Sequence, residues 1–259
     1  MDIELAEKKR RKIKILKNLI QSGREYSEDN LCLNFLSEEL IDEYGILETV
    51  NVSAHDYDCY ALELINSKPH GIFLDCGSGK RPNYHENIIN LEIVNYDTTD
   101  VLSIGENLPF KDNVFDGVFS LNVLEHVKDP FLCAKEIARV LKPNGELYCV
   151  VPFMSPYHDY PDHFYNMTKS GLANLFEKYL TIQKQDVIDS GLPIFSLTWI
   201  LNNWINGLKD IQTRDNFINM KVGDLIADPA SYLDRPFVRE LSREKNFELG
   251  ATTALWGKK

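Results

Sequence analysis

The sequence predicts an α/β protein with a doubly wound, Rossmann-like sheet of seven mostly parallel strands. From residue 70 onward, short apolar runs alternate with helical segments, which is typical of a parallel sheet with crossover connections. The run 147–151 is apolar on both faces, as a central parallel strand should be. The run 72–75 leads directly into a glycine turn, Gly77-Ser78-Gly79, which is a common place for a ligand at the end of a strand.

The elements of this core follow from apolar periodicity and from turn residues. The predicted strands are Gly71–Asp75, Ile89–Asn95, Asp100–Ile104, Phe115–Leu121 and Glu146–Pro152. A helix is expected to begin after Asp129, with Pro130 in its first turn, and to end at Lys142-Pro143-Asn144-Gly145. Its inner stripe is predicted to be Phe131, Ala134, Ile137, Ala138 and Leu141. The connection from Gly79 to Ile89 is short for a crossover helix, so an irregular turn around Arg81-Pro82 is expected.

Four segments are expected along the chain. Residues 1–69 would form an N-terminal helical extension, 70–188 the Rossmann-like core, 189–246 an inserted helical cap, and 247–259 the final strand of the core. Within them we predict a helix near Lys169–Tyr179, a strand at Leu180–Ile188, an amphipathic helix over 194–208 and a strand at Phe247–Trp256.

Composition limits the class of protein. A net charge of −11 argues against broad nucleic-acid binding. The basic run KKRRKIKILK at 8–17 departs from that balance, and either it belongs to a helix that docks on its own domain or it contacts an anionic membrane surface or an acidic partner. The sequence contains no stretch of 18 apolar residues, so no membrane span is expected. Five cysteines without Cys-x-x-Cys spacing favour a reduced, cytoplasmic protein without a zinc site or a disulfide framework.

The glycine turn favours a particular kind of ligand. A dinucleotide-binding turn would carry a third glycine where this chain has Pro82. Asp75, directly before the turn, would repel a pyrophosphate and suits a ligand that carries positive charge. Glu92 lies 13 residues after Gly79, at the second strand of the core, where a carboxylate can accept hydrogen bonds from both hydroxyls of a ribose.

Residues 72–152 resemble the core of the class I S-adenosylmethionine-dependent methyltransferases, in particular the broad group with a Leu-Pro-Phe segment. The matching blocks are Asp75-Cys76-Gly77-Ser78-Gly79, Asn90-Leu91-Glu92-Ile93, Leu108-Pro109-Phe110-Lys111-Asp112, Phe115-Asp116, Val123-Leu124-Glu125-His126-Val127 and Arg139-Val140-Leu141-Lys142-Pro143-Asn144-Gly145. Each block is short, but together, in this order and at these separations, they are specific.

The resemblance implies S-adenosylmethionine as the cofactor and assigns residues to it. Gly77, Ser78 and Gly79 would hold its amino-acid end, and Asp75 would orient the ammonium group through backbone or water. Glu92 would bind the ribose. The segment 104–108, with Gly105 and Leu108, would flank the adenine, and Asn122 would lie beside the methionine part. Many relatives carry an acid where this chain has Ile104, so adenine recognition is expected from backbone groups or from Ser103.

Candidate catalytic residues follow the fourth and fifth strands of the core. They are His126 and, in the polar and aromatic loop after Pro152, His158, Asp162 and His163. A histidine and a carboxylate could supply a base and the group that orients it. The alternatives are a loop ordered by its own packing, a structural role for His126 and, less favoured, a metal site made by the same loop. We therefore predict no metal.

The resulting prediction is a methyltransferase that acts on a small-molecule or glycan acceptor, at oxygen. The acceptor is inferred from resemblance to methyltransferases of surface-polysaccharide and natural-product pathways, which is a fold-level argument. Two alternatives remain at this point: a non-catalytic module that binds a partner through its basic first helix, and an NAD-dependent oxidoreductase, against which Pro82 argues.

Overall fold

A computed structural model of the chain describes residues 3–49, 52–158 and 160–252. Contacts divide the chain into two units. The first unit comprises Met1–Pro152 and Tyr160–Gln185, and the second comprises Phe153–Asp159 and Asp186–Lys259. The chain therefore enters the second unit, returns to the first, and then leaves it again.

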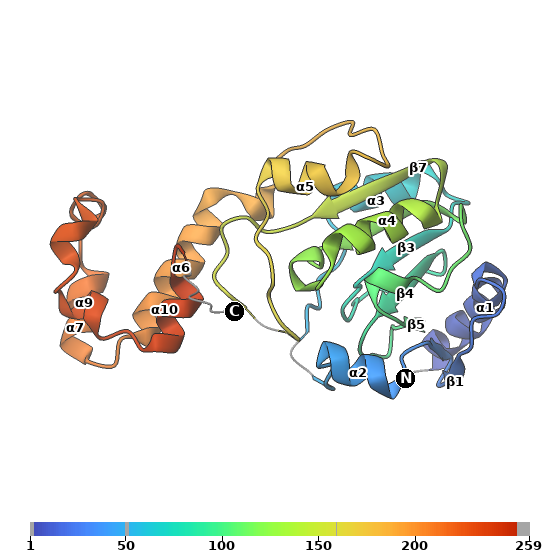
Figure 1. Ribbon diagram of the computed structural model, residues 1–259, viewed down its shortest axis with the longest axis horizontal. Coiled ribbons are helices and arrows are strands. Elements are labelled where there is room, and N and C mark those ends of the chain that lie inside the picture. Colours follow the sequence, from blue (N-terminus) through green and yellow to red (C-terminus); the bar gives the residue numbers. More distant parts are fainter. Residues whose placement is uncertain (1–2, 50–51, 159, 253–259) are drawn as a thin grey trace, which may run out of the picture. The chain divides into compact units, whose positions relative to one another are not determined.

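The first unit is built on a seven-stranded sheet with the order β1-β2-β5-β4-β3-β6-β7 (Figure 1). The strands are β1 (Ser27–Asp29), β2 (Cys32–Asn34), β3 (Phe73–Cys76), β4 (Ile88–Glu92), β5 (Val101–Leu102), β6 (Phe115–Leu121) and β7 (Leu141–Val150). Only the pair β1 and β2 is antiparallel among these strands. The predicted Rossmann-like class of fold is therefore confirmed.

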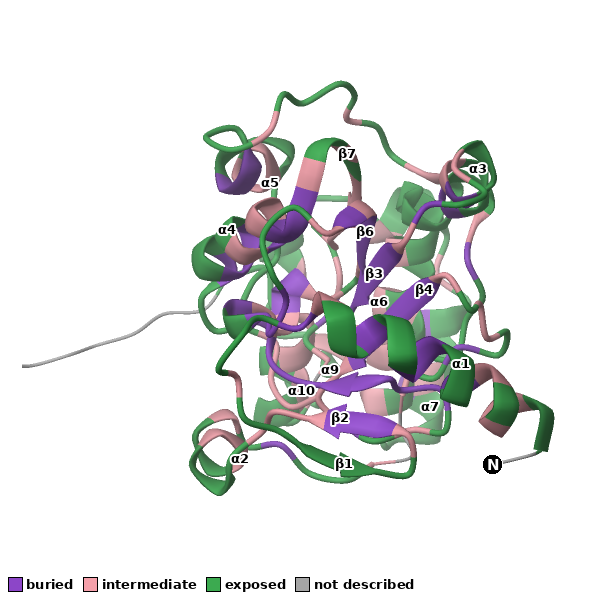
Figure 2. Cartoon of the chain, turned by 90° about the vertical axis from the view of Figure 1, so that its right-hand side faces the viewer, coloured by how far each residue is buried: buried purple, intermediate pink, exposed green. Residues whose placement is uncertain are grey.

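Helices cover both faces of this sheet because successive strand residues point to opposite sides. Phe73 packs with helix α3 (Cys59–Ser67), whereas its neighbour Leu74 belongs to the cluster that includes α4 (Pro130–Val140) and α5 (Lys169–Phe176). Strands β3 to β6 are mainly buried, whereas β1 is exposed, and the helices of this unit expose their outer faces to solvent (Figure 2). As predicted, an irregular turn and not a helix connects β3 to β4.

Helix α4 begins as the sequence predicts, but its buried stripe is rotated. The Asp129 side chain accepts a hydrogen bond from Leu132 N, and Pro130 occupies the first turn. Phe131 is 52% exposed, so its prediction as an inner residue was wrong. Cys133 is buried instead, because the side chains of Cys133, Ala134 and Ile137 together form the face turned to the sheet.

The N-terminal segment 1–69 contributes strands as well as helices, which the sequence analysis missed. Helices α1 (Ile3–Leu19), α2 (Glu38–Tyr44) and α3 are present, but β1 and β2 form a hairpin that extends the sheet beside β5. Asn30 and Leu31, with φ of 49° and 62°, make the two-residue turn of this hairpin. Strands of three residues are too short to show an apolar alternation.

Helix α1 docks on the first unit through two buried lysines. Lys9 Nζ donates to the carbonyl oxygens of Asp97 and Thr99, at 3.1 and 2.6 Å. Lys12 Nζ lies 2.7 Å from Asp100 Oδ2, and both lysines are 1% exposed. These contacts support the interpretation in which the basic run attaches the helix to its own domain.

Two predicted strands near the C-terminus are absent from the residues that the structure describes. Residues 180–188 form no strand although they are rich in Ile, Val and Thr, since a β-prone segment needs a partner strand and the sheet order ends at β7. Residues 247–249, the start of the second predicted strand, belong to helix α10 (Arg243–Leu249), which Ser242 caps by accepting from Lys245 N. The rest of that prediction, from 253 onward, lies outside the described residues.

The second unit is helical over its described part. It contains η3 (Asp189–Gly191), α6 (Pro193–Gly207), α7 (Ile211–Ile218), α8 (Val222–Leu225), η4 (Pro229–Tyr232), α9 (Pro236–Arg239) and α10. Trp204, Phe217 and Phe237 join α6, α7 and α9 through ring contacts of 5.0 to 6.3 Å between centroids. The predicted helix over 194–208 is thus present as α6. Among the described helices of the whole chain, none combines the length and the apolar character that a membrane crossing requires.

Candidate functional site

The glycine turn follows β3 and lies beside the ends of β4 and β6. Gly77 and Ser78 donate their backbone N–H groups to Leu91 O, at 2.9 and 3.0 Å. Gly77 and Gly79 have φ of 82° and 60°, in the left-handed region that favours glycine. A Cβ on Gly77 would meet Val123 Cγ2 at 2.5 Å, and a Cβ on Gly79 would meet Ser53 O at 2.5 Å. Both positions therefore require glycine for conformation and for space.

Gly77→Ala is expected to destabilise the turn by more than backbone strain alone. The left-handed conformation costs an alanine roughly 1–2 kcal/mol, and the contact with Val123 adds to this cost. Gly23→Ala is a matched control, because Gly23 has φ of 83° and a Cβ added there would meet no atom within 4 Å. Urea unfolding should show a larger loss for Gly77→Ala than for Gly23→Ala, and Val123→Ala should recover part of the difference. Equal losses in the two variants would contradict the proposed clash.

Glu92 ends β4 and faces the glycine turn, as the sequence analysis expected. Its Oε2 accepts from Gly79 N and its Oε1 accepts from Ile93 N, both at 2.8 Å. Burial raises the pKa of the Glu92 carboxyl above its ordinary value, although the two backbone N–H groups act in the opposite direction. A carboxylate has about four lone-pair positions. Two therefore remain for the hydroxyls of a ligand.

Asp75 is fully buried beneath the turn and is held by two side chains that the sequence analysis did not identify. Tyr57 Oη donates to Asp75 Oδ2 at 2.6 Å, and Arg81 Nε donates to the same oxygen at 2.8 Å. The Arg81 guanidinium also lies over the Tyr57 ring, 4.5 Å from its centroid, and donates to the carbonyl oxygen of His55. The guanidinium of Arg81 thus balances the negative charge of Asp75, and the buried carboxylate stabilises the turn through these contacts.

The segment after β5 comes close to the start of the glycine turn. A Cβ on Gly105 would lie 3.6 Å from Cys76 Sγ and 2.7 Å from Cys133 Sγ. Ile104 and Leu108 are buried. The Ser103 hydroxyl lies 3.2 Å from Asn107 O, to which it donates, so its proton is used within the loop. Backbone groups are then the better candidates for adenine recognition in this segment.

Asn122 stands at the carboxyl end of β6, on the other side of the turn. It has φ of 57°, its side chain is exposed, and its N–H donates to Val150 O at 2.8 Å. The next residue, Val123, is the one that packs against Gly77. The structure therefore brings the carboxyl ends of β3, β4 and β6 together around the turn.

Three of the four predicted catalytic residues meet in the first unit. His126 Nδ1 lies 2.7 Å from the carbonyl oxygen of Asp162, and the His126 and His163 rings are 5.7 Å apart. The Asp162 side chain accepts from His163 N. Glu125, next to His126 in the chain, was not among the predicted residues; it is fully buried, and burial raises its pKa to about 8. Its block was recognised, but no local pattern distinguished it from an exposed acid.

His158 belongs to the second unit, where it lines a hollow of about 410 Å³. Its ring centroid lies 5.1 Å from that of Trp199, on α6. His158 Nδ1 lies 3.0 Å from Pro156 O, and because a carbonyl oxygen only accepts, this nitrogen carries the proton. The residues that line the hollow are Tyr157, His158, Trp199, Asn203, Glu244 and Glu248.

Comparison with known proteins agrees with this arrangement. Residues 75–149 match the family model described as "Methyltransferase domain". An uncharacterised protein of Methanocaldococcus jannaschii is 34% identical over 134 residues, which are 47% of this chain and 52% of that protein. Cycloartenol-C-24-methyltransferase 1 of Oryza sativa subsp. japonica is 41% identical over 56 residues, 22% of this chain and 16% of the enzyme. The chain thus spans about half or less of the length of these relatives.

Solved structures of similar fold align with about half of the chain. A SAM-dependent methyltransferase from Methanosarcina mazei is 19% identical, with a TM-score of 0.39, and the alignment covers 53% of this chain and 93% of that one. The [4+2]-cyclase SpnF is 16% identical, with a TM-score of 0.36, and the alignment covers 46% of this chain and 55% of that one.

The fold and the glycine turn, together with the match of residues 75–149 to the methyltransferase domain, support a class I methyltransferase. S-adenosylmethionine is the cofactor of this family.

Proposed function

We propose that this protein transfers the methyl group of S-adenosylmethionine to a hydroxyl oxygen of a small-molecule or glycan acceptor. The observation that carries the cofactor part is the contact of Glu92 with Gly79, which joins the acid of β4 to the turn after β3. Such a pair places a ribose acceptor beside the backbone turn, at the carboxyl ends of parallel strands, where folds of this type have a crevice for ligands.

The residues of this crevice fit the cofactor in three respects. Gly77 and Gly79 allow the left-handed backbone and the close packing against Val123 and Ser53 that place the turn beside Glu92. Glu92 retains lone pairs for two hydroxyl groups. Gly105 packs closely against Cys133, which keeps the segment proposed to flank the adenine near Cys76. Asn122 would then lie beside the methionine part, and the bound cofactor supplies an activated methyl group on a sulfonium sulfur.

The acceptor is inferred from the hollow of the second unit. Tyr157 and Trp199 offer aromatic surface. The side chains of Asn203, Glu244 and Glu248 can accept hydrogen bonds from hydroxyls, and the Asn203 amide can also donate to them. This mixture suits a polyhydroxylated acceptor. Because Nδ1 of His158 carries the ring proton in the neutral imidazole, Nε2 has the lone pair that can accept a hydroxyl proton. His158 is therefore our candidate base, and His126, Asp162 and His163 are candidates for positioning.

Glu92→Gln is expected to weaken the binding of S-adenosylmethionine by about ten- to a hundredfold, since a charge-assisted hydrogen bond contributes about 1.5–3 kcal/mol. The amide would also oppose the N–H of Gly79 or of Ile93. Calorimetric titration of both proteins with S-adenosylmethionine measures the change. Glu86→Gln replaces an acid in the β3–β4 connection that pairs with Arg11. This variant should leave the affinity unchanged. An unchanged affinity in Glu92→Gln would remove this residue from the cofactor site.

The proposed reaction is tested with labelled S-adenosylmethionine and a panel of sugars, lipids and phenols, followed by mass spectrometry. A labelled methyl group on a hydroxyl oxygen is the expected result, and His158→Ala should lower turnover while leaving cofactor affinity intact. Methylation at nitrogen or carbon would overturn the acceptor class. Titration with NAD serves as a control, and binding of NAD without binding of S-adenosylmethionine would overturn the proposed function.

A further inference from the structure

Glu125 is a buried acid whose charge is not compensated by hydrogen bonds. Its side chain is 0% exposed, and neither Oε1 nor Oε2 has a hydrogen-bond partner among the residues that the structure describes. Placing an unpaired carboxylate away from water is costly, so such groups generally have a partner or bind a metal ion. A ligand of positive charge would satisfy both oxygens.

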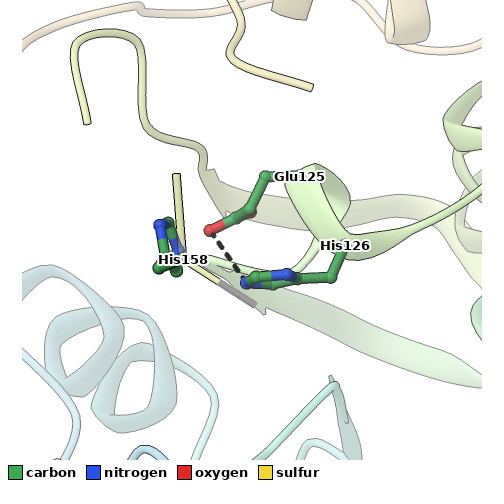
Figure 3. Close-up of side chains that lie close together, drawn as sticks. All are labelled: Glu125, His126 and His158. Carbon is green, nitrogen blue, oxygen red and sulfur yellow. Dashed lines mark ion pairs between the residues drawn. The ribbon is translucent and has the colours of Figure 1, made fainter. Parts of the chain in front are cut away.

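His126 presents a second ligand atom to the same place. Figure 3 shows the Glu125 carboxylate directed at the His126 ring, and Oε1 lies 3.9 Å from Nε2. His126 Nδ1 donates its proton to the carbonyl oxygen of Asp162, at 2.7 Å, which leaves the lone pair of the neutral ring on Nε2. Metal-binding histidines almost always donate their other ring N–H to a carbonyl or a carboxylate in this way.

The backbone around these two residues is fixed before any ligand binds. Both belong to the short helix η2 (Leu124–His126), which follows Asn122 at the end of β6. The carbonyl oxygen of Glu125 accepts from Phe164 N and Tyr165 N, at 2.7 and 3.2 Å. The loop that supplies the Asp162 carbonyl therefore also holds Glu125, so the two ligand atoms are positioned by one network.

We propose that Glu125 and His126 bind a divalent first-row metal cation, such as Mn²⁺, at the carboxyl end of β6. A mixed carboxylate and imidazole set suits such an ion, and a movement of a few tenths of an ångström would bring both atoms to coordination distance. Water would complete the coordination. The catalytic use of the ion rests on the proposed function: a cation at this place lowers the pKa of an acceptor hydroxyl.

The test measures metal binding directly, with full-length protein that has been stripped by a chelator. Titration with MnCl₂, followed by calorimetry and by loss of the free Mn²⁺ resonance signal, should show one bound ion. Glu125→Gln and His126→Ala should each weaken binding at least tenfold. Glu106→Gln is the matched control, because this buried acid already accepts backbone N–H groups, and it should bind Mn²⁺ like the unaltered protein.

A folding defect is separated from loss of a ligand by thermal unfolding in chelator and in Mn²⁺. Glu125→Gln should be at least as stable as the unaltered protein in chelator, because it removes a buried carboxyl group that has no hydrogen-bond partner, but only the unaltered protein should gain stability from Mn²⁺. No binding by the unaltered protein, or equal binding by Glu125→Gln, would overturn the metal site. Titration with S-adenosylmethionine in chelator tests the proposed function separately, since failure there leaves the metal result standing.

Discussion

Replacing Arg81 by methionine is expected to lower the free energy of unfolding by about 3–5 kcal/mol, the usual cost of breaking a buried ion pair from one side. Arg81 is 6% exposed and Asp75 is 0% exposed. The variant leaves the Asp75 carboxylate buried with Tyr57 as its remaining side-chain partner. Because Asp75 directly precedes Cys76 and the glycine turn, affinity for S-adenosylmethionine should fall as well. Urea unfolding and calorimetric titration measure the two effects.

Two further variants show whether the loss of stability comes from the unpaired charge of Asp75. Lys80→Met changes the neighbouring exposed residue and should leave both measurements unaffected. The double variant Asp75→Asn/Arg81→Met removes both charges, so it should be more stable than Arg81→Met alone. If the single and double variants are equally unstable, the loss reflects packing of the arginine and not its charge.

Lys12→Met should destabilise the first unit by about 3 kcal/mol, because it also leaves a buried carboxylate, that of Asp100, without its cationic partner. Lys12 and Asp100 are 1% and 3% exposed, and Lys12 also donates to the carbonyl oxygen of Ile88. Asp100 keeps hydrogen bonds from Tyr84 and from Asn90 N, which places the expected loss at the lower end of the range for buried pairs.

The neighbouring Arg11 provides the control for this prediction. Its ion pair with Glu86 is exposed, with 57% and 44% of the two side chains accessible, so Arg11→Met should have no measurable effect on unfolding. Urea denaturation of both variants compares a buried and an exposed pair on the same helix. Equal stability of Lys12→Met and Arg11→Met would show that the buried lysine contributes nothing.

The features that could be predicted from the sequence depend on short stretches of chain. A strand that enters Gly77-Ser78-Gly79 and an acid at the end of the next strand are local patterns, and parallel strands bring their carboxyl ends to one edge. The position of Glu92 against Gly79 follows from these rules alone. Helix α4 was predictable for a similar reason, because Asp129 and Pro130 mark its start.

The features that were missed depend on contacts between distant segments. Tyr57 lies 18 residues before Asp75, and nothing near it in the sequence shows that its hydroxyl reaches that carboxylate. The burial of Lys9 and Lys12 was hidden in the same way, since a run of cations resembles a solvated helix face. Residues 180–188 show the opposite error: their β-prone side chains permit a strand, but pairing requires a neighbour.

Helix α1 produces a weaker electric field around it than its amino-acid sequence suggests. Seven cationic residues occur between positions 8 and 17, but the ammonium groups of two, Lys9 and Lys12, are buried. The charged groups of Lys8, Arg11 and Lys17 lie against carboxylates of the same molecule. Few counterions would therefore gather along the helix, and any attraction to an acidic surface should be short-ranged and readily abolished by salt.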